Sequence, residues 1–103
     1  MAKKTHPLDS QQRSSLTKKA QRLKPIVMVG KSGLTDEVIK AVTEALESHE
    51  LIKVKFVDYK DEKKDLSRVI ADKTDSQLVR LIGNIAIYYW YQPDPDKRRI
   101  SVS

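Results

Sequence analysis

The segment Gly30-Lys31-Ser32-Gly33 contains the residue types that bind phosphate. Glycines let the backbone approach an anion closely, and a lysine between them supplies a positive point charge. The segment follows an apolar run and precedes a predicted helix, whose unpaired N-terminal amides and dipole favour an anion. The alternative to a phosphate-binding loop is an ordinary strand-to-helix turn, which these four residues alone slightly favour. The positive charge of the surrounding sequence reverses that preference and favours phosphate binding.

Two nucleotide-binding motifs fail on spacing. A P-loop requires a glycine five residues before Gly30, where the sequence has Pro25. A dinucleotide fingerprint requires a glycine two residues before Gly30, and Met28 stands there. The loop therefore indicates phosphate contact of a more general kind than nucleotide binding by either motif.

The positive charge is concentrated near the N-terminus. The formal net charge is +6, and residues 1–34 contain eight Lys or Arg and one acid, Asp9, a net of +7, which leaves −1 for the rest. Such a field draws polyanions to one face, whereas the alternative is a solvated basic tail. Besides the glycine loop, the residues expected to bind a polyanion are Lys18, Lys19, Arg22 and Lys24 in and after the first helix, and Lys53 and Lys55 on a later strand.

Residues for catalysis or metal binding are few. The 103 residues include no cysteine, which excludes disulfides, thiol nucleophiles and zinc knuckles and fits a reducing cytosol. His49 is expected to be a helix-terminal residue, and the acidic residues do not converge on a metal site. No apolar run approaches the roughly 20 residues that span a bilayer. We therefore expect a cytoplasmic protein without catalytic residues, metal, cofactor or membrane partner.

Four of the six aromatic residues are consecutive, at positions 88–91. On a strand, Tyr89 and Tyr91 share one face while Tyr88 and Trp90 share the other. One face is expected in the core, and the other either stacks on bases or covers the sheet.

Hydrophobic periodicity and turn residues predict an α/β fold with the order helix-strand-helix-strand-helix-hairpin. Helix crossovers make the first strands parallel, and the hairpin adds antiparallel ones, in a mixed sheet of four or five strands. Residues 1–8 are expected to form a flexible basic arm, and 9–103 a single domain. The predicted elements are a helix capped by Asp9 and ending before Pro25, a strand at 26–29 buried on both faces, a helix from Thr35, a strand at 51–57, a helix at 61–74 with Leu66, Val69 and Ile70 inward, strands at 78–82 and 85–91 around Gly83-Asn84, and a possible edge strand at 99–102.

Two blocks carry a family resemblance. Residues 23–35, LKPIVMVGKSGLT, and residues 49–56, HELIKVKF, resemble the CRM domain in its bacterial, single-domain, YhbY-like branch. The resemblance covers roughly residues 8 to 91 and places the family's GxxG loop on Gly30, Lys31, Ser32 and Gly33. It implies a fold similar to the C-terminal domain of translation initiation factor three. It also implies an RNA-binding module associated with the precursor of the large ribosomal subunit. The segment after the hairpin, with Trp90 near the family's usual basic residue, departs from the pattern.

These observations lead to one main hypothesis and one alternative. The main hypothesis is a monomeric, non-enzymatic protein that binds structured RNA, namely precursor large-subunit ribosomal RNA, and assists ribosome assembly, with pre-ribosomal proteins as further partners. The alternative is a protein-interaction adaptor within a ribonucleoprotein complex, motivated by the aromatic strand and the acidic helices.

Overall fold

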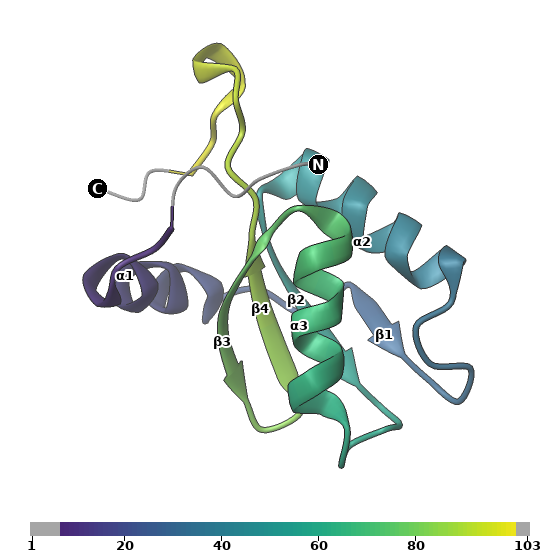
Figure 1. The fold of residues 1–103 in the computed structure, drawn as a ribbon. Coiled ribbons are helices and arrows are strands. Elements are labelled where there is room, and N and C mark those ends of the chain that lie inside the picture. The colour runs from purple at the N-terminus through teal and green to yellow at the C-terminus, as the bar shows by residue number, and fades with distance from the viewer. Residues whose placement is uncertain (1–6, 101–103) are drawn as a thin grey trace.

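The computed structural model describes residues 7–100, and Figure 1 shows their helices arranged around a four-stranded sheet. The α/β class and the predicted order of helices and strands are confirmed. In chain order the elements are α1 (Ser10–Ala20), β1 (Val27–Val29), α2 (Asp36–His49), β2 (Leu51–Phe56), α3 (Lys63–Thr74), β3 (Gln77–Ile82), β4 (Ile85–Tyr89) and the short 3-10 helix η1 (Pro95–Lys97).

The sheet is mixed, with the strand order β1-β2-β4-β3. β1 and β2 are parallel, because α2 carries the chain back between them, and the other two pairings are antiparallel. The hairpin between β3 and β4 turns at Gly83-Asn84, with Ile82 opposite Ile85 and Gly83 at φ 58°. A positive φ at the first turn residue is easily adopted by glycine and suits a two-residue hairpin.

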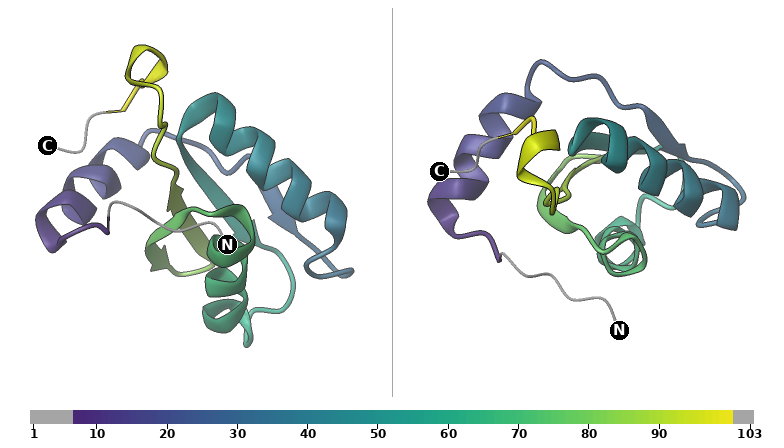
Figure 2. Two further views of the ribbon diagram at one scale, coloured as in Figure 1. Left: turned by 45° about the horizontal axis from the view of Figure 1, so that its top comes forward. Right: turned by 90° about the horizontal axis from the view of Figure 1, so that it is seen from above.

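The helices cover the two faces of the sheet unequally. α2 and α3 lie on one face and α1 on the other (Figure 2). The core on the α2 and α3 side contains Phe56 and Tyr88, and the core on the α1 side contains Leu16 and Tyr89. Both faces of the central strands are therefore buried, but by different helices.

The prediction that residues 26–29 form a strand buried on both faces is wrong. β1 is an edge strand in which Val27 and Val29 are buried while Met28 is 51% exposed. α1 packs mainly against β2, β3 and β4, so it leaves the outer face of β1 open. An apolar run of four residues is compatible with either arrangement, and only the position of α1 decides between them.

Four smaller expectations also need correction. α1 ends at Ala20 rather than continuing toward Pro25, and Val69 on α3 is 37% exposed rather than in the core. Residues 99–100 form no strand, and the rest of the expected strand at 99–102 lies outside the described residues. Leu8, assigned to the arm, is buried under α1. The remainder of that arm, residues 1–6, lies outside the described residues.

Arg13 covers part of the β3 edge. Its Nη1 donates to the carbonyl oxygens of Leu78, at 2.6 Å, and Val79, at 3.0 Å, where the ladder with β4 is irregular. The backbone N–H of Leu8 donates to the side chain of Gln77 at 3.0 Å. Backbone groups on an edge strand are open to pairing with another chain, so the two contacts of Arg13 close part of that edge.

Glu50 fixes the end of the domain where β2 begins. It ends α2 in a left-handed conformation, φ 66°, and is 1% exposed. Its carboxylate accepts hydrogen bonds from the backbone N–H groups of Arg99, at 2.9 and 3.0 Å, and Ile100, at 3.0 Å. Its carbonyl oxygen accepts from the N–H of Trp90 at 2.8 Å. One buried carboxylate thus holds the C-terminal segment against the sheet.

Replacing Glu50 should release that segment. We expect Glu50→Ala to lower the free energy of unfolding by about 1–3 kcal/mol, because charge-assisted hydrogen bonds in a buried setting are lost. Urea denaturation measures the loss, and amide exchange should accelerate at Arg99 and Ile100. Glu47→Ala, at an exposed position of the same helix, is the matched control. Equal stability of the two variants would contradict the anchoring role.

Candidate nucleic-acid interface

The glycine loop is held at the junction of β1 and β2. The N–H of Gly33 donates to the carbonyl oxygen of Gly30 at 3.0 Å, which closes a tight turn. Immediately before the loop, the carbonyl oxygen of Val29 accepts from the N–H groups of Val57, at 2.9 Å, and Asp58, at 3.1 Å. The loop therefore starts from a backbone position that the following β2 segment fixes.

Tyr59 is the contact that sequence reasoning missed. Its hydroxyl donates to the carbonyl oxygen of Lys31 at 2.9 Å, and its ring lies against Gly33. Tyr59 itself has φ 57°, a left-handed conformation that is uncommon for a residue with a side chain. One sequence signal could have indicated this contact: Tyr59 is an isolated aromatic residue just after β2. Because β1 and β2 are parallel neighbours, the segments that follow them start from the same edge of the sheet.

The two glycines have different roles. Gly33 is buried, adopts φ 72°, and a Cβ there would lie 3.5 Å from the ring of Tyr59. Gly33 therefore serves the turn and its packing, and it is not open to a ligand. A Cβ at Gly30 would have no atom within 4 Å, so Gly30 is the position where a phosphate can approach the backbone.

The helix dipole contributes less than the sequence suggested. Thr35 caps α2 by accepting from the N–H of Val38 at 3.1 Å, and Asp36 and Glu37 occupy the first turn. Two carboxylates already meet the positive end of the helix, which weakens its attraction for an external anion. The attraction therefore comes mainly from Lys31 and the loop amides.

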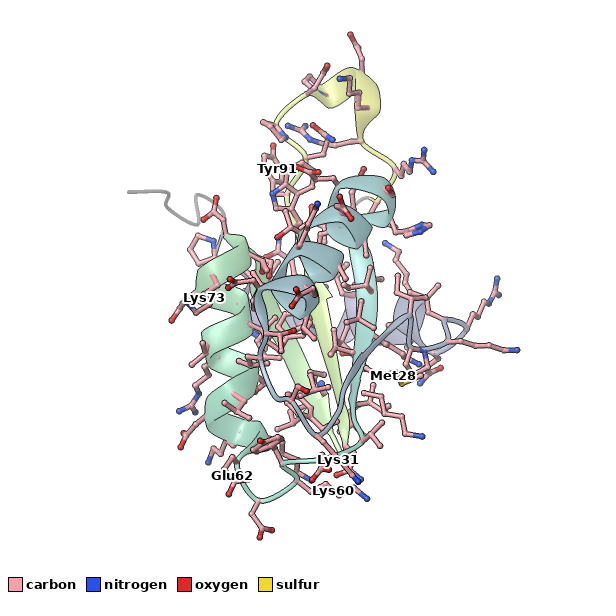
Figure 3. All side chains as sticks on the ribbon, turned by 90° about the vertical axis from the view of Figure 1, so that its right-hand side faces the viewer. Met28, Lys31, Lys60, Glu62, Lys73 and Tyr91 are labelled. Carbon is pink, nitrogen blue, oxygen red and sulfur yellow. The ribbon has the colours of Figure 1, made fainter. Side chains whose placement is uncertain are left out.

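Lys31 and Ser32 are exposed at the tip of the loop. Within residues 7–100, no acceptor pairs with their backbone N–H groups. Figure 3 shows Lys31 and Lys60 at the same end of the molecule. Two ammonium groups and open backbone donors at one tip suit a phosphate ligand.

Lysines of β2 and of the segment before β1 lie beside the outer face of β1, beyond the loop. Met28 lies opposite Lys55 in the parallel register, and the N–H of Ile26 donates to the carbonyl oxygen of Lys53 at 3.1 Å. Because Val27 and Val29 point into the core, alternation directs these neighbours to the face that α1 leaves open. We call this surface the β1 strip; it consists of Lys31, Met28, Lys55, Ile26, Lys53 and Lys24.

The basic residues of α1 and those at the far end of the strip differ in their surroundings. Lys19 and Lys24 line a cavity at the end of β1 opposite the glycine loop. Lys53 is partly engaged, since its Nζ donates to the carbonyl oxygen of Leu23 at 3.0 Å and so fixes the connection between α1 and β1. Lys18 and Arg22 are exposed but do not line this cavity. The structure thus brings most of the predicted residues to one strand edge rather than to one point.

Acidic residues occupy the neighbouring segment after β2. Asp58, Asp61 and Glu62 line a shallow depression there together with Tyr59 and Lys60. Figure 3 shows Glu62 displaced from Lys31 toward α3. The positive surface therefore extends from Lys31 along β1 rather than toward α3.

The aromatic segment covers the two cores instead of forming a stacking platform. Tyr88 and Tyr89 are 0% and 1% exposed and belong to different cores. The Tyr88 hydroxyl donates to the carbonyl oxygen of Ser67 at 2.7 Å, and burial raises the pKa of both tyrosines above the ordinary value. Tyr91 is partly buried, with the guanidinium of Arg98 4.2 Å from its ring centre. Base stacking by Tyr88 or Tyr89 is excluded by their burial.

Other kinds of site find little support in the described chain. His49 is exposed at the end of α2, as expected of a helix-terminal residue. Between residues 7 and 100, no three metal-binding side chains gather at one point. The helices described there are all too short or too polar to cross a membrane.

Comparison with known proteins finds relatives over most of the chain. The model of the CRS1 / YhbY (CRM) domain family matches residues 8–90. "Probable RNA-binding protein YqeI" of Bacillus subtilis is 41% identical over 83 residues, which are 80% of this chain and 86% of that protein. A Pseudomonas aeruginosa protein, also named a probable RNA-binding protein, is 33% identical over 97 residues and 93% of each chain.

A solved structure has the same fold. The solution structure of hypothetical protein SAV1595 from Staphylococcus aureus, described as a candidate RNA-binding protein, superposes with a TM-score of 0.76 at 30% identity. The alignment covers 92% of this chain and all of that one. With the family model spanning the sheet, the three helices and the Gly30–Gly33 loop, this chain belongs to the CRS1/YhbY (CRM) domain family.

Proposed function

We propose that this chain binds structured RNA by contacting phosphates through the Gly30–Gly33 loop and the β1 strip, without catalysing a reaction. The observation that carries the proposal is the set of lysines beside the open edge strand β1, with Lys53 and Lys55 on β2 and Lys31 in the loop, where two backbone N–H groups have no acceptor within residues 7–100. Relatives named as RNA-binding proteins support it. Lysines and backbone amides recognise phosphate and helix shape more readily than base edges, so sequence specificity is limited.

The RNA we propose is the precursor of large-subunit ribosomal RNA, and the role is assistance in assembling that subunit in the cytoplasm. This finer assignment rests on the CRM resemblance. The alternative of a protein-interaction adaptor loses one of its two motives, because Tyr88 and Tyr89 of the aromatic strand are buried, while the acidic residues of α2 and α3 remain at the surface.

Binding to matched hairpins tests the proposed function. We expect the protein to bind an RNA hairpin more tightly than a DNA hairpin of the same sequence, with an affinity that falls as salt rises. In cells, it should sediment with precursor large subunits, and nuclease should release it. Equal affinity for RNA and DNA would contradict the preference, and absence from pre-ribosomal fractions would contradict the assembly role.

Replacing Lys31 should remove one phosphate contact. We expect Lys31→Ala to reduce the slope of log affinity against log salt by about one, by similar amounts for different RNAs, with little change in thermal stability. Lys73→Ala is the matched control, since Lys73 is exposed on α3 and Figure 3 shows it well away from Lys31. If the slope of log affinity against log salt is unchanged in Lys31→Ala, or is reduced equally in both variants, Lys31 does not contact a phosphate.

The two glycines should respond differently to the same substitution. Gly33→Ala forces a Cβ onto a left-handed backbone and should cost roughly 1 kcal/mol of stability. Gly30→Ala should fold normally, because its Cβ meets no neighbour, and should weaken RNA binding by obstructing the approach of a phosphate. Thermal denaturation and hairpin titration of both variants separate the two effects. Normal RNA affinity in Gly30→Ala would show that no phosphate approaches there.

A further inference from the structure

A cavity of about 320 Å³ lies at the end of the β1 strip opposite the glycine loop. Its walls come from the end of α1, the connection to β1, the junction of α2 with β2, and the C-terminal segment. The lining consists of five aliphatic residues, Leu23, Ile26, Leu51, Ile52 and Ile100, and three basic ones, Lys19, Lys24 and His49.

Two contacts already described build the cavity. The carboxylate of Glu50 holds the backbone of Ile100, which closes one wall. The Nζ of Lys53 donates to the carbonyl oxygen of Leu23, which fixes another wall. Both walls are therefore positioned by polar contacts to other elements rather than by the cavity residues alone.

The side chains that line the cavity indicate which chemical groups a ligand would need. Among the described residues, no acidic side chain lines the cavity, and the Glu50 carboxylate beside it is occupied by the N–H groups of Arg99 and Ile100. An apolar interior with lysines suits a ligand with a flat apolar body and an attached anion. The His49 imidazole adds a group that can donate or accept a hydrogen bond at a polar edge. A nucleotide has all three features.

Size and position favour one nucleotide of a longer strand. The volume is near the lower limit of small-molecule pockets, roughly 300–1,000 Å³, and so leaves no room for a run of bases. Ile26 in the cavity and Gly30 in the loop are four residues apart on an extended strand, a distance of roughly 13 Å. A backbone held at Lys31 can therefore follow the strip past Met28 and reach the cavity.

We propose that the cavity binds a single unpaired nucleotide of the RNA, with its base against the aliphatic lining and its phosphate at Lys19 and Lys24. This inference rests on the proposed function and adds a preference for RNA that presents a bulged or unpaired residue. The glycine loop then binds RNA without regard to pairing, and the cavity selects a local defect in the helix.

A titration with mononucleotides tests the cavity directly. Adenosine and uridine monophosphates should cause saturable NMR shifts in the methyl groups of Ile26, Ile52 and Ile100. Inorganic phosphate should leave these methyl groups unmoved, because it has no base to place in the cavity. No saturable methyl shift, or the same shift with phosphate alone, would overturn the inference.

A pair of RNA hairpins tests the preference. We expect roughly tenfold tighter binding of a hairpin with one bulged fluorescent purine than of the fully paired hairpin, from burial of one base. Ile26→Trp should fill the cavity mouth and abolish this preference. Ile82→Trp is the matched control, because Ile82 is likewise 51% exposed but lies on β3, at the opposite edge of the sheet from β1, and does not line the cavity.

The outcomes separate the two proposals. If the parent binds both hairpins equally, or if both tryptophan variants keep or lose the preference alike, the cavity inference fails while RNA binding stands. If neither hairpin binds, the proposed function fails, and the mononucleotide titration alone decides the cavity. Should Ile26→Trp not fold, Lys24→Ala, which leaves the aliphatic lining intact, should still reduce the preference, and an unchanged preference would count against the inference.

Discussion

The candidate interface depends on three parallel residue pairs between β1 and β2. This short register sets Met28 beside Lys55 and brings the carbonyl oxygen of Val29 to the N–H groups of Val57 and Asp58. The glycine loop and the segment with Tyr59 meet only because the two strands end at the same edge. A slip of one residue would turn Met28 inward and Val27 outward, which the core does not tolerate. The burial of two valines therefore determines the position of the whole basic surface.

Unequal coverage of the sheet explains why a basic surface exists beside two buried cores. α2 and α3 cover one face, so β2 directs Val54 and Phe56 there. α1 covers only part of the other face, and the residues of β2 that point that way change from Leu51, which is buried, to Lys55, which is exposed. The β1 strip is thus the part of this sheet face that α1 does not cover, while the part under α1 belongs to the core.

Features that depend on local chemistry could be predicted from the sequence. The capping box of Asp9 with Gln12, the cap at Thr35 and the Gly83-Asn84 hairpin are all present, because each is decided within a few residues. The exposure of Met28 could not be predicted, since it depends on where α1 ends.

The contact of Tyr59 with Lys31 and Gly33 was not predicted, because it joins segments 28 residues apart and becomes visible only once β1 and β2 are known to be parallel neighbours. The pair Gly30 and Gly33 looked equivalent in the sequence. Only the ring above Gly33 and its positive φ distinguish a structural glycine from an open one.

Arg13 closes part of the β3 edge, whereas within residues 7–100 no comparable contact covers the outer edge of β1. A foreign strand that pairs with β1 must therefore compete for the surface that we assign to RNA. Three residues give such a strand few hydrogen bonds, and the lysines of the strip repel a second positively charged copy of the chain. Occupation by nucleic acid would cover this edge, so the ligand would also protect the protein against self-association.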